Sequence, residues 1–180
     1  MSGNNDHPVY YFFETMYPHR EKLFAIGRAS ENAGWYADMF PRLTYVEADL
    51  RVIPRPEGFF EVGFCNAVVE HAGSRAEQRA LIHEICRGCD RVFVTTPNRL
   101  FPVEVHTALP FLHWLPRPWF GAILRTLGLT HLSTEADLNL LTAREFLALF
   151  PPTHRARLVL GGMYPFGVSL ACVAERVSSV

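Results

Sequence analysis

The sequence has no excess of basic charge and no long apolar run. Its 17 Lys and Arg residues are balanced by 18 Asp and Glu residues, which gives a formal net charge of −1. A protein that binds nucleic acid through phosphates needs basic residues that release counterions, so this balance argues against that class of partner. The longest apolar stretches, such as 59–67 and 111–115, are far shorter than the roughly 20 residues of a membrane-spanning helix. We therefore expect neither a nucleic-acid nor a membrane partner.

The first eight residues also lack the basic start and the apolar run of a secretory signal, which predicts a cytoplasmic protein. Its four cysteines are then expected to be reduced. Cys86 and Cys89 form a Cys-x-x-Cys pair, a pattern found in redox sites and in half of a zinc site. No second half is present, and Cys65 and Cys172 fall within predicted strands, so the favoured role is packing as small apolar side chains.

Large apolar side chains are plentiful. The 180 residues include 14 Phe, 6 Tyr and 3 Trp, enough for a core that needs no disulfide or metal staple. The length fits one domain over residues 1–180, and no internal repeat, low-complexity tract or second-domain boundary interrupts it.

Short apolar runs alternate with helical patterns along the chain. The clearest helix covers 74–87, where Ser74 and Glu77 form a capping box, and two more helices are predicted over 31–40 and 142–149. This alternation favours an α/β domain with a mostly parallel sheet covered on both faces, and with ligands beyond the carboxyl ends of its strands. The predicted strands are 23–27, 43–48, 61–66, 92–96, 157–160 and 168–173.

A stretch rich in proline, aromatic residues and histidine, at about 97–120, breaks this rhythm. It holds five prolines between Pro97 and Pro118, and long loops inside compact domains are usually functional, so we expect an ordered loop or lid. The alternative is that its apolar side chains only pack over the edge of the sheet; these are Phe111, Leu112, Trp114 and Leu115.

Several segments in order, spread over residues 10–175, resemble class I S-adenosylmethionine-dependent methyltransferases of the type 11 group. Residues 45–50 and 60–71 resemble the middle of such a domain, and 91–98 resembles its fifth strand. Residues 101–116, with Phe101-Pro102-Val103-Glu104-Val105-His106 at their start, resemble the loop of one bacterial subgroup. The resemblance implies a Rossmann-like fold, S-adenosylmethionine as cofactor with S-adenosylhomocysteine as product, and methyl transfer to a small-molecule acceptor.

The same resemblance implies the cofactor-binding residues. Asp49 matches the acidic residue near the adenine amino group, with Leu50 beside the ring, a role that suits a carboxylate acceptor and an apolar neighbour. An Asp at a strand end that only makes a turn is the alternative. Asn66 and Ala67 match positions where the backbone approaches the methionine portion of the cofactor.

The chain departs from the family at its amino end. It has no segment like the first strand and its glycine-rich cofactor loop, and residues 23–27 already resemble the second strand. Gly27 and Arg28 stand where that strand ends, at the place where the family usually has an acidic residue for the ribose hydroxyls. Glu31 is the nearest substitute. The fold implied is thus a methyltransferase sheet that is truncated or rearranged at the N-terminus.

The missing strand normally lies in the middle of the sheet, between the second and fourth strands. Its absence exposes two strand edges with unpaired amides and carbonyls. Three solutions remain open: a rearranged strand order, surface from another chain, or a sequence that begins downstream of the ancestral start. The second solution predicts a homodimer or other oligomer.

Histidines and glutamates supply the candidate acid/base chemistry, since histidine titrates near neutral pH. Of this set, His71, Glu104 and His106 are the predicted catalytic residues, with Glu70 and His113 as further members. Each histidine alone also fits a hydrogen-bonded loop residue. Because these residues are scattered without a tight ligand spacing, no metal site is predicted. The predicted function is methyl transfer, and the alternative is a non-catalytic binding or assembly subunit that keeps the scaffold.

Overall fold

The computed structural model describes residues 12–27, 38–160 and 167–177. The chain divides into two compact units, residues 1–54 and 55–180. The single-domain organisation therefore stays a prediction. No helix in the described parts of the chain combines the length and the apolar character needed to cross a membrane.

The first unit holds a two-stranded parallel sheet. Strand β1 (Phe24–Gly27) pairs with β2 (Thr44–Glu47), so that Phe24 lies opposite Thr44. Both predicted strands are confirmed. Helix α1 (Phe12–Met16) and the 3₁₀ turn η2 (Arg20–Lys22) precede them. The predicted helix over 31–40 falls mostly outside the described residues.

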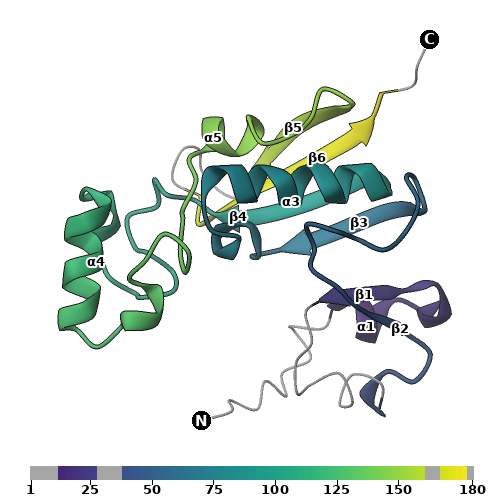
Figure 1. Cartoon of the computed structure of the whole chain (residues 1–180), viewed down its shortest axis with the longest axis horizontal. Coiled ribbons are helices and arrows are strands. Elements are labelled where there is room, and N and C mark those ends of the chain that lie inside the picture. The colour runs from purple at the N-terminus through teal and green to yellow at the C-terminus, as the bar shows by residue number, and fades with distance from the viewer. Residues whose placement is uncertain (1–11, 28–37, 161–166, 178–180) are drawn as a thin grey trace. The chain divides into compact units, whose positions relative to one another are not determined.

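The second unit holds a four-stranded sheet in the order β3-β4-β6-β5 (Figure 1). The β3–β4 pairing is parallel, whereas β4–β6 and β6–β5 are antiparallel, so the expectation of a mostly parallel sheet is wrong for this unit. The reason is the short connection between the last two strands, because a parallel crossover needs a dozen or more residues. All four predicted strands are present with longer bounds: β3 (Phe60–Asn66), β4 (Cys89–Pro97), β5 (His154–Leu160) and β6 (Ser169–Arg176).

Helix α3 (Arg75–Gly88) connects β3 to β4 and lies along the sheet (Figure 1). Its predicted capping box is present: Ser74 accepts a hydrogen bond from the Glu77 backbone and the Glu77 side chain accepts one from the Ser74 backbone. The helix buries Leu81, Ile82 and Ile85, the predicted apolar face. Helix α5 (Ala143–Leu147) also begins with a capping box, formed by Thr142 and Glu145.

The segment after β4 is a loop up to residue 116, with one 3₁₀ turn, η4 (Leu112–Trp114). Helix α4 (Arg117–Thr126) begins inside the range predicted as loop, because Pro118 near its start has the backbone angle that a first helical turn requires. This helix and the turn η5 (Thr130–Leu132) form a small core apart from the sheet, as Figure 1 shows for α4. Leu112 packs against that core, so the alternative of packing over the sheet edge does not hold for it.

Strand β3 has one hydrogen-bonded neighbour among the described strands, and so has β1. The absence of the family's first strand, expected from the sequence, stays a prediction. Val62 and Phe64 on β3 are 60% and 48% exposed, an apolar surface of the kind that favours association. Formation of an oligomer stays a prediction.

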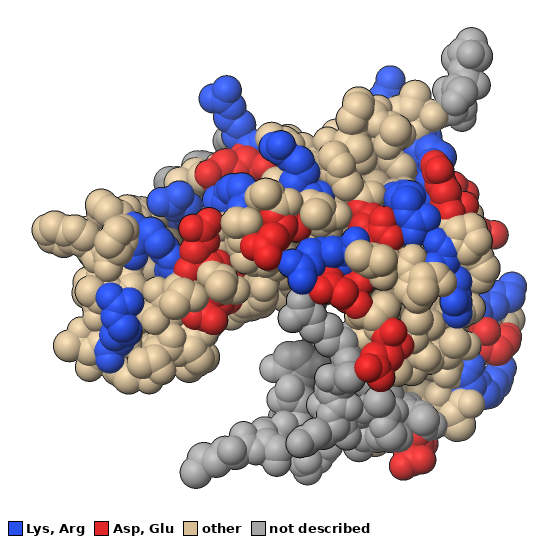
Figure 2. Space-filling view, in the orientation of Figure 1, with Lys and Arg blue, Asp and Glu red and all other residues tan. Residues whose placement is uncertain are grey.

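Charges of both signs are interspersed on the face shown in Figure 2, where Lys and Arg side chains lie among Asp and Glu side chains. Such a mixed surface lacks the single-sign field that steers a protein to a phosphate backbone. The absence of a nucleic-acid partner stays a prediction.

All four cysteines are buried and free. Burial is the main cause that raises the pKa of Cys65 and of Cys86 to about 12, which keeps both thiols protonated and unreactive near neutral pH. Their burial favours the packing role expected from the sequence.

Candidate functional site

A polar cluster forms just beyond the carboxyl end of β3. The 3₁₀ turn η3 (Val69–His71) follows that strand and carries Glu70, whose side chain is fully buried. Glu70 Oε2 accepts a hydrogen bond of 3.0 Å from Thr96 Oγ1 near the end of β4. Glu70 Oε1 is buried and has no hydrogen-bond partner. A buried carboxylate oxygen without a partner is costly, which marks this position as unusual.

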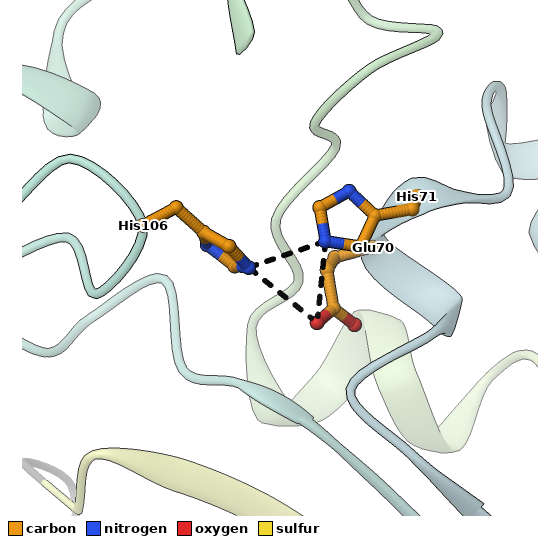
Figure 3. Close-up of side chains that lie close together, drawn as sticks. All are labelled: Glu70, His71 and His106. Carbon is orange, nitrogen blue, oxygen red and sulfur yellow. Dashed lines mark hydrogen bonds and ion pairs between the residues drawn. The ribbon is translucent and has the colours of Figure 1, made fainter. Parts of the chain in front are cut away.

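His71 and His106 bring their imidazole rings together from two separate loops. His71 Nδ1 lies 2.6 Å from the Asp137 carbonyl oxygen, which can only accept, so Nδ1 carries the hydrogen. The His71 Nε2 atom lies 3.2 Å from His106 Nε2, and the rings meet edge to face at 4.9 Å. Both Nε2 atoms lie 3.9 Å from Glu70 Oε1 (Figure 3).

Glu104 holds His106 in place from its other side. This carboxylate is 2% exposed and accepts hydrogen bonds from His106 Nδ1 at 2.7 Å, the His106 amide at 3.0 Å and the Thr107 amide at 2.7 Å. Burial by itself raises the pKa of Glu104, but the hydrogen bonds from His106 and Thr107 outweigh it and lower that pKa to about 2. The hydrogen bond to Glu104 in turn raises the pKa of His106.

The two carboxyl groups of the cluster have opposite environments. Burial raises the pKa of Glu70, and its hydrogen bonds and the neighbouring histidines offset this only in part. Neighbouring titratable groups whose pKa values are pushed apart are typical of sites that move protons.

The structure therefore brings together four of the five residues of the predicted acid/base set, namely Glu70, His71, Glu104 and His106. His113 is not among them, because its buried ring bonds through Nε2 to the Arg99 carbonyl oxygen at 3.0 Å. These four residues are scattered along the sequence, but the fold brings their side chains together, so the expectation that they lie apart is wrong. Their catalytic roles stay predictions.

Three residues that support the cluster were missed by the sequence analysis. Thr96 bonds Glu70 and the Asp137 carbonyl anchors His71. Gln78 joins turn η3 to the segment around residue 139 through 3.0 Å and 2.7 Å bonds to the Val69 and Asn139 carbonyls. Gln78 is fully buried on α3. The sequence did contain a signal for Gln78: its spacing places this polar residue on the same helix face as the apolar residues at positions 81, 82 and 85.

Asn66 and Ala67, the residues predicted to approach the methionine portion of the cofactor, lie at the end of β3. Ala67 has a φ of 53°, a left-handed conformation that costs a non-glycine residue of order 1–3 kcal/mol and that clusters at functional sites. Its amide donates to the Thr95 carbonyl at 3.2 Å, and Asn66 Oδ1 accepts from the Thr95 hydroxyl. The backbone after β3 is thus held in a constrained turn directly before the polar cluster.

The residues predicted to bind the adenine and the ribose of the cofactor belong to the first unit. Asp49 follows β2 and accepts hydrogen bonds from the Arg51 backbone at 2.9 Å and from its guanidinium at 2.7 and 3.0 Å. These bonds match the alternative of a turn-forming Asp, and a cofactor role for Asp49 stays a proposal. Leu50 is half-buried, and Gly27 is the last residue of β1. Arg28 lies outside the described residues.

No family model matches the sequence, and no curated protein matches it significantly. Solved structures do match its fold. PigF with SAH superposes with a TM-score of 0.54 at 18% identity, over 87% of this chain and 48% of PigF. A SAM-dependent methyltransferase from Methanosarcina mazei gives a TM-score of 0.56 at 10% identity, over 89% of this chain and 85% of that protein. The chain has a Rossmann-like methyltransferase fold.

The N-methyltransferase NodS from Bradyrhizobium japonicum, in complex with S-adenosyl-L-homocysteine, shares this fold with a TM-score of 0.53 and 11% identity, over 93% of this chain and 72% of NodS. The chain thus spans about half the length of PigF and most of the length of NodS. At these identities the likeness shows the fold alone, and function must be argued from the site.

Proposed function

We propose that the chain is a methyltransferase that transfers a methyl group from S-adenosylmethionine to a small-molecule acceptor. The observation that carries this proposal is the position of the Glu70–His71–Glu104–His106 cluster, just beyond the carboxyl end of β3. Open α/β sheets bind their ligands at that edge. The structures of PigF and NodS, which hold S-adenosylhomocysteine in the same fold, support the choice of cofactor.

The residues present fit part of the cofactor. The constrained backbone at Asn66 and Ala67 suits close approach of the methionine portion. The assignment of Asp49 and Leu50 to the adenine rests on the resemblance of the sequence, since both Asp49 carboxylate oxygens accept hydrogen bonds from Arg51. Gly27 and Arg28 would adjoin the ribose, where no acidic residue stands. S-adenosylmethionine supplies an electrophilic methyl group on a sulfonium centre, so the task of this chain is mainly to position the acceptor in line with it.

A cavity of about 230 Å³, whose lining does not include Glu70, His71, Glu104 or His106, offers room for a small acceptor. Arg99, His113 and Arg117 line it together with Asn139, whose backbone N–H donates to the Glu70 carbonyl oxygen at 2.7 Å. On two of these residues one side-chain atom, Arg117 Nε and His113 Nδ1, is buried without a hydrogen-bond partner. The charged and polar side chains that line the cavity favour a ligand with polar groups.

His71 and His106 would handle the acceptor's proton. If an acceptor O–H or N–H group came within hydrogen-bond distance of either Nε2 atom, that imidazole would accept its proton during methyl transfer, for which S-adenosylmethionine would supply the methyl group. Glu104 and the Asp137 carbonyl fix the ring orientations that this transfer requires.

Isothermal titration of the chain with S-adenosylmethionine and with S-adenosylhomocysteine tests the proposal. Binding of either compound supports it. If neither binds, the methyltransferase proposal is wrong for this chain, and the alternative of a non-catalytic binding or assembly subunit on the same scaffold takes its place.

Replacing Asp49 with alanine should weaken S-adenosylhomocysteine binding by about 1.5 to 3 kcal/mol, because a hydrogen bond from the adenine amino group to a carboxylate is lost. Arg51→Ala is the matched control, since it breaks the same Asp49–Arg51 ion pair and leaves the carboxylate in place. Equal affinities of wild type and Asp49→Ala, or an equal loss in both variants, would assign Asp49 to the turn alone.

A further inference from the structure

Three ligand-type atoms converge at the centre of the cluster. Glu70 Oε1, His71 Nε2 and His106 Nε2 all lie within 4.8 Å of one another (Figure 3). The Nδ1 atoms of both rings already donate hydrogen bonds, His71 to the Asp137 carbonyl and His106 to Glu104. In the neutral rings, therefore, both Nε2 lone pairs point into the space that the unpartnered carboxylate oxygen also borders.

We propose that Glu70, His71 and His106 bind one divalent transition-metal ion of the zinc class. Binding itself needs neither S-adenosylmethionine nor the acceptor. The chemical use of the ion rests on the proposed function: an ion there would coordinate the acceptor's oxygen or nitrogen and ease loss of its proton, in place of proton uptake by an imidazole.

The distances fit such an ion closely. Zinc–nitrogen bonds of 2.0–2.1 Å in a tetrahedral site place two ligand atoms about 3.4 Å apart. The two Nε2 atoms are 3.2 Å apart, and Glu70 Oε1 is 3.9 Å from each, so the carboxylate has to move by only about 0.5 Å. No hydrogen bond holds Glu70 Oε1 where it is.

The hydrogen bonds around the proposed ligands are those found around metal ligands in proteins. A metal-bound histidine almost always donates its other ring N–H to a carboxylate or a backbone carbonyl, and both arrangements are present in this cluster. Such bonds fix which nitrogen faces the metal. The buried charge of Glu70, which the protein leaves without a hydrogen bond on Oε1, is offset once a cation lies beside it.

The ligand types set the class of the ion. Two imidazoles and one carboxylate are the protein ligands of catalytic zinc sites that keep a fourth position open. Imidazole ligands favour zinc and similar metals over magnesium or calcium, which prefer oxygen alone. An open fourth position would be left for the acceptor atom.

Zinc titration of chelator-stripped, dialysed protein tests the inference without any cofactor. We expect one Zn²⁺ per chain, with affinity reduced in His71→Ala and in His106→Ala by more than the roughly 10- to 100-fold that loss of an outer partner costs. Glu104→Gln, which changes only such an outer partner, should fall within that range. His83→Ala, at an exposed position of α3, is the matched control and should bind as wild type does.

No zinc binding by the wild type, or equal affinity in His71→Ala, would overturn the inference. Co²⁺ substitution of the wild-type protein guards against variants that fail to fold: d–d absorption without a thiolate charge-transfer band is expected, and a thiolate band would assign the metal to the buried cysteines instead. These outcomes are independent of the titrations with S-adenosylmethionine. A chain that binds that cofactor but no zinc retains the proposed function and loses only the metal site.

Discussion

Replacing Glu104 with glutamine is expected to lower the free energy of unfolding by about 3 kcal/mol at pH 7. The folded protein holds the pKa of this carboxyl at about 2, against an ordinary value of 4.5, because it accepts three hydrogen bonds from His106 and Thr107. Glutamine removes the charge and turns an N–H group toward one of these donors. Urea unfolding followed by tryptophan fluorescence measures the loss.

The loss should depend on pH in a defined direction. The pKa of Glu104 is lowered by folding, so its contribution to stability is fully present above about pH 4.5 and disappears as the pH falls toward about 2. Wild type and Glu104→Gln should therefore converge in stability across that window. Glu175→Gln, which changes an exposed carboxylate on β6, is the control and should lie within about 0.5 kcal/mol of wild type throughout. A cost that is the same at every pH would show that Glu104 acts through packing rather than through charge.

The sequence predicted the local elements well because their causes are local. Short apolar runs located the six described strands, and the spacing of Ser74 to Glu77 and of Thr142 to Glu145 located two helix starts that the structure confirms. The antiparallel position of β6 between β4 and β5 was missed. Strand order depends on pairing between distant segments, and no local pattern in 169–176 records it.

The candidate site also depends on contacts between segments that are distant in the sequence. Glu70 and His71 come from the turn after β3, whereas His106 comes from a loop 35 residues further along the chain than His71. Single residue types suggested acid/base chemistry for each, but their convergence on one space depends on contacts made only in the fold. Gln78 ties the turn that carries Glu70 and His71 to the segment around residue 139, and Glu104 holds His106. A ligand spacing that exists only in the fold cannot be recognised from sequence spacing.

Glu70→Gln is expected to have the opposite effect to Glu104→Gln: in metal-free protein the variant should be more stable than wild type above pH 4.5. Burial raises the pKa of Glu70, so the folded state holds this proton more tightly than the unfolded state does. Wild-type stability therefore falls as the pH rises from 4.5 to the folded pKa, by up to about 1.4 kcal/mol per pH unit from this one group. Glutamine is free of that cost, and its amide can donate to the imidazole nitrogens that Oε1 faces.

Unfolding in urea at pH 5, 6, 7 and 8, with a chelator present, measures the difference between Glu70→Gln and wild type. The advantage of the variant should grow with pH and then level off, while the exposed-site control Glu175→Gln shows no such trend. Added Zn²⁺ should then reverse the order, because zinc at about 100 times its dissociation constant stabilises a folded protein that binds it by about 2.7 kcal/mol and the variant lacks the carboxylate ligand. Such a reversal would show that Glu70 destabilises the metal-free protein and stabilises the metal-bound protein, as expected of a metal ligand. If Glu70→Gln is the less stable protein at every pH without metal, the buried carboxylate is a structural group held by Thr96, and its unpartnered oxygen is not kept for a ligand.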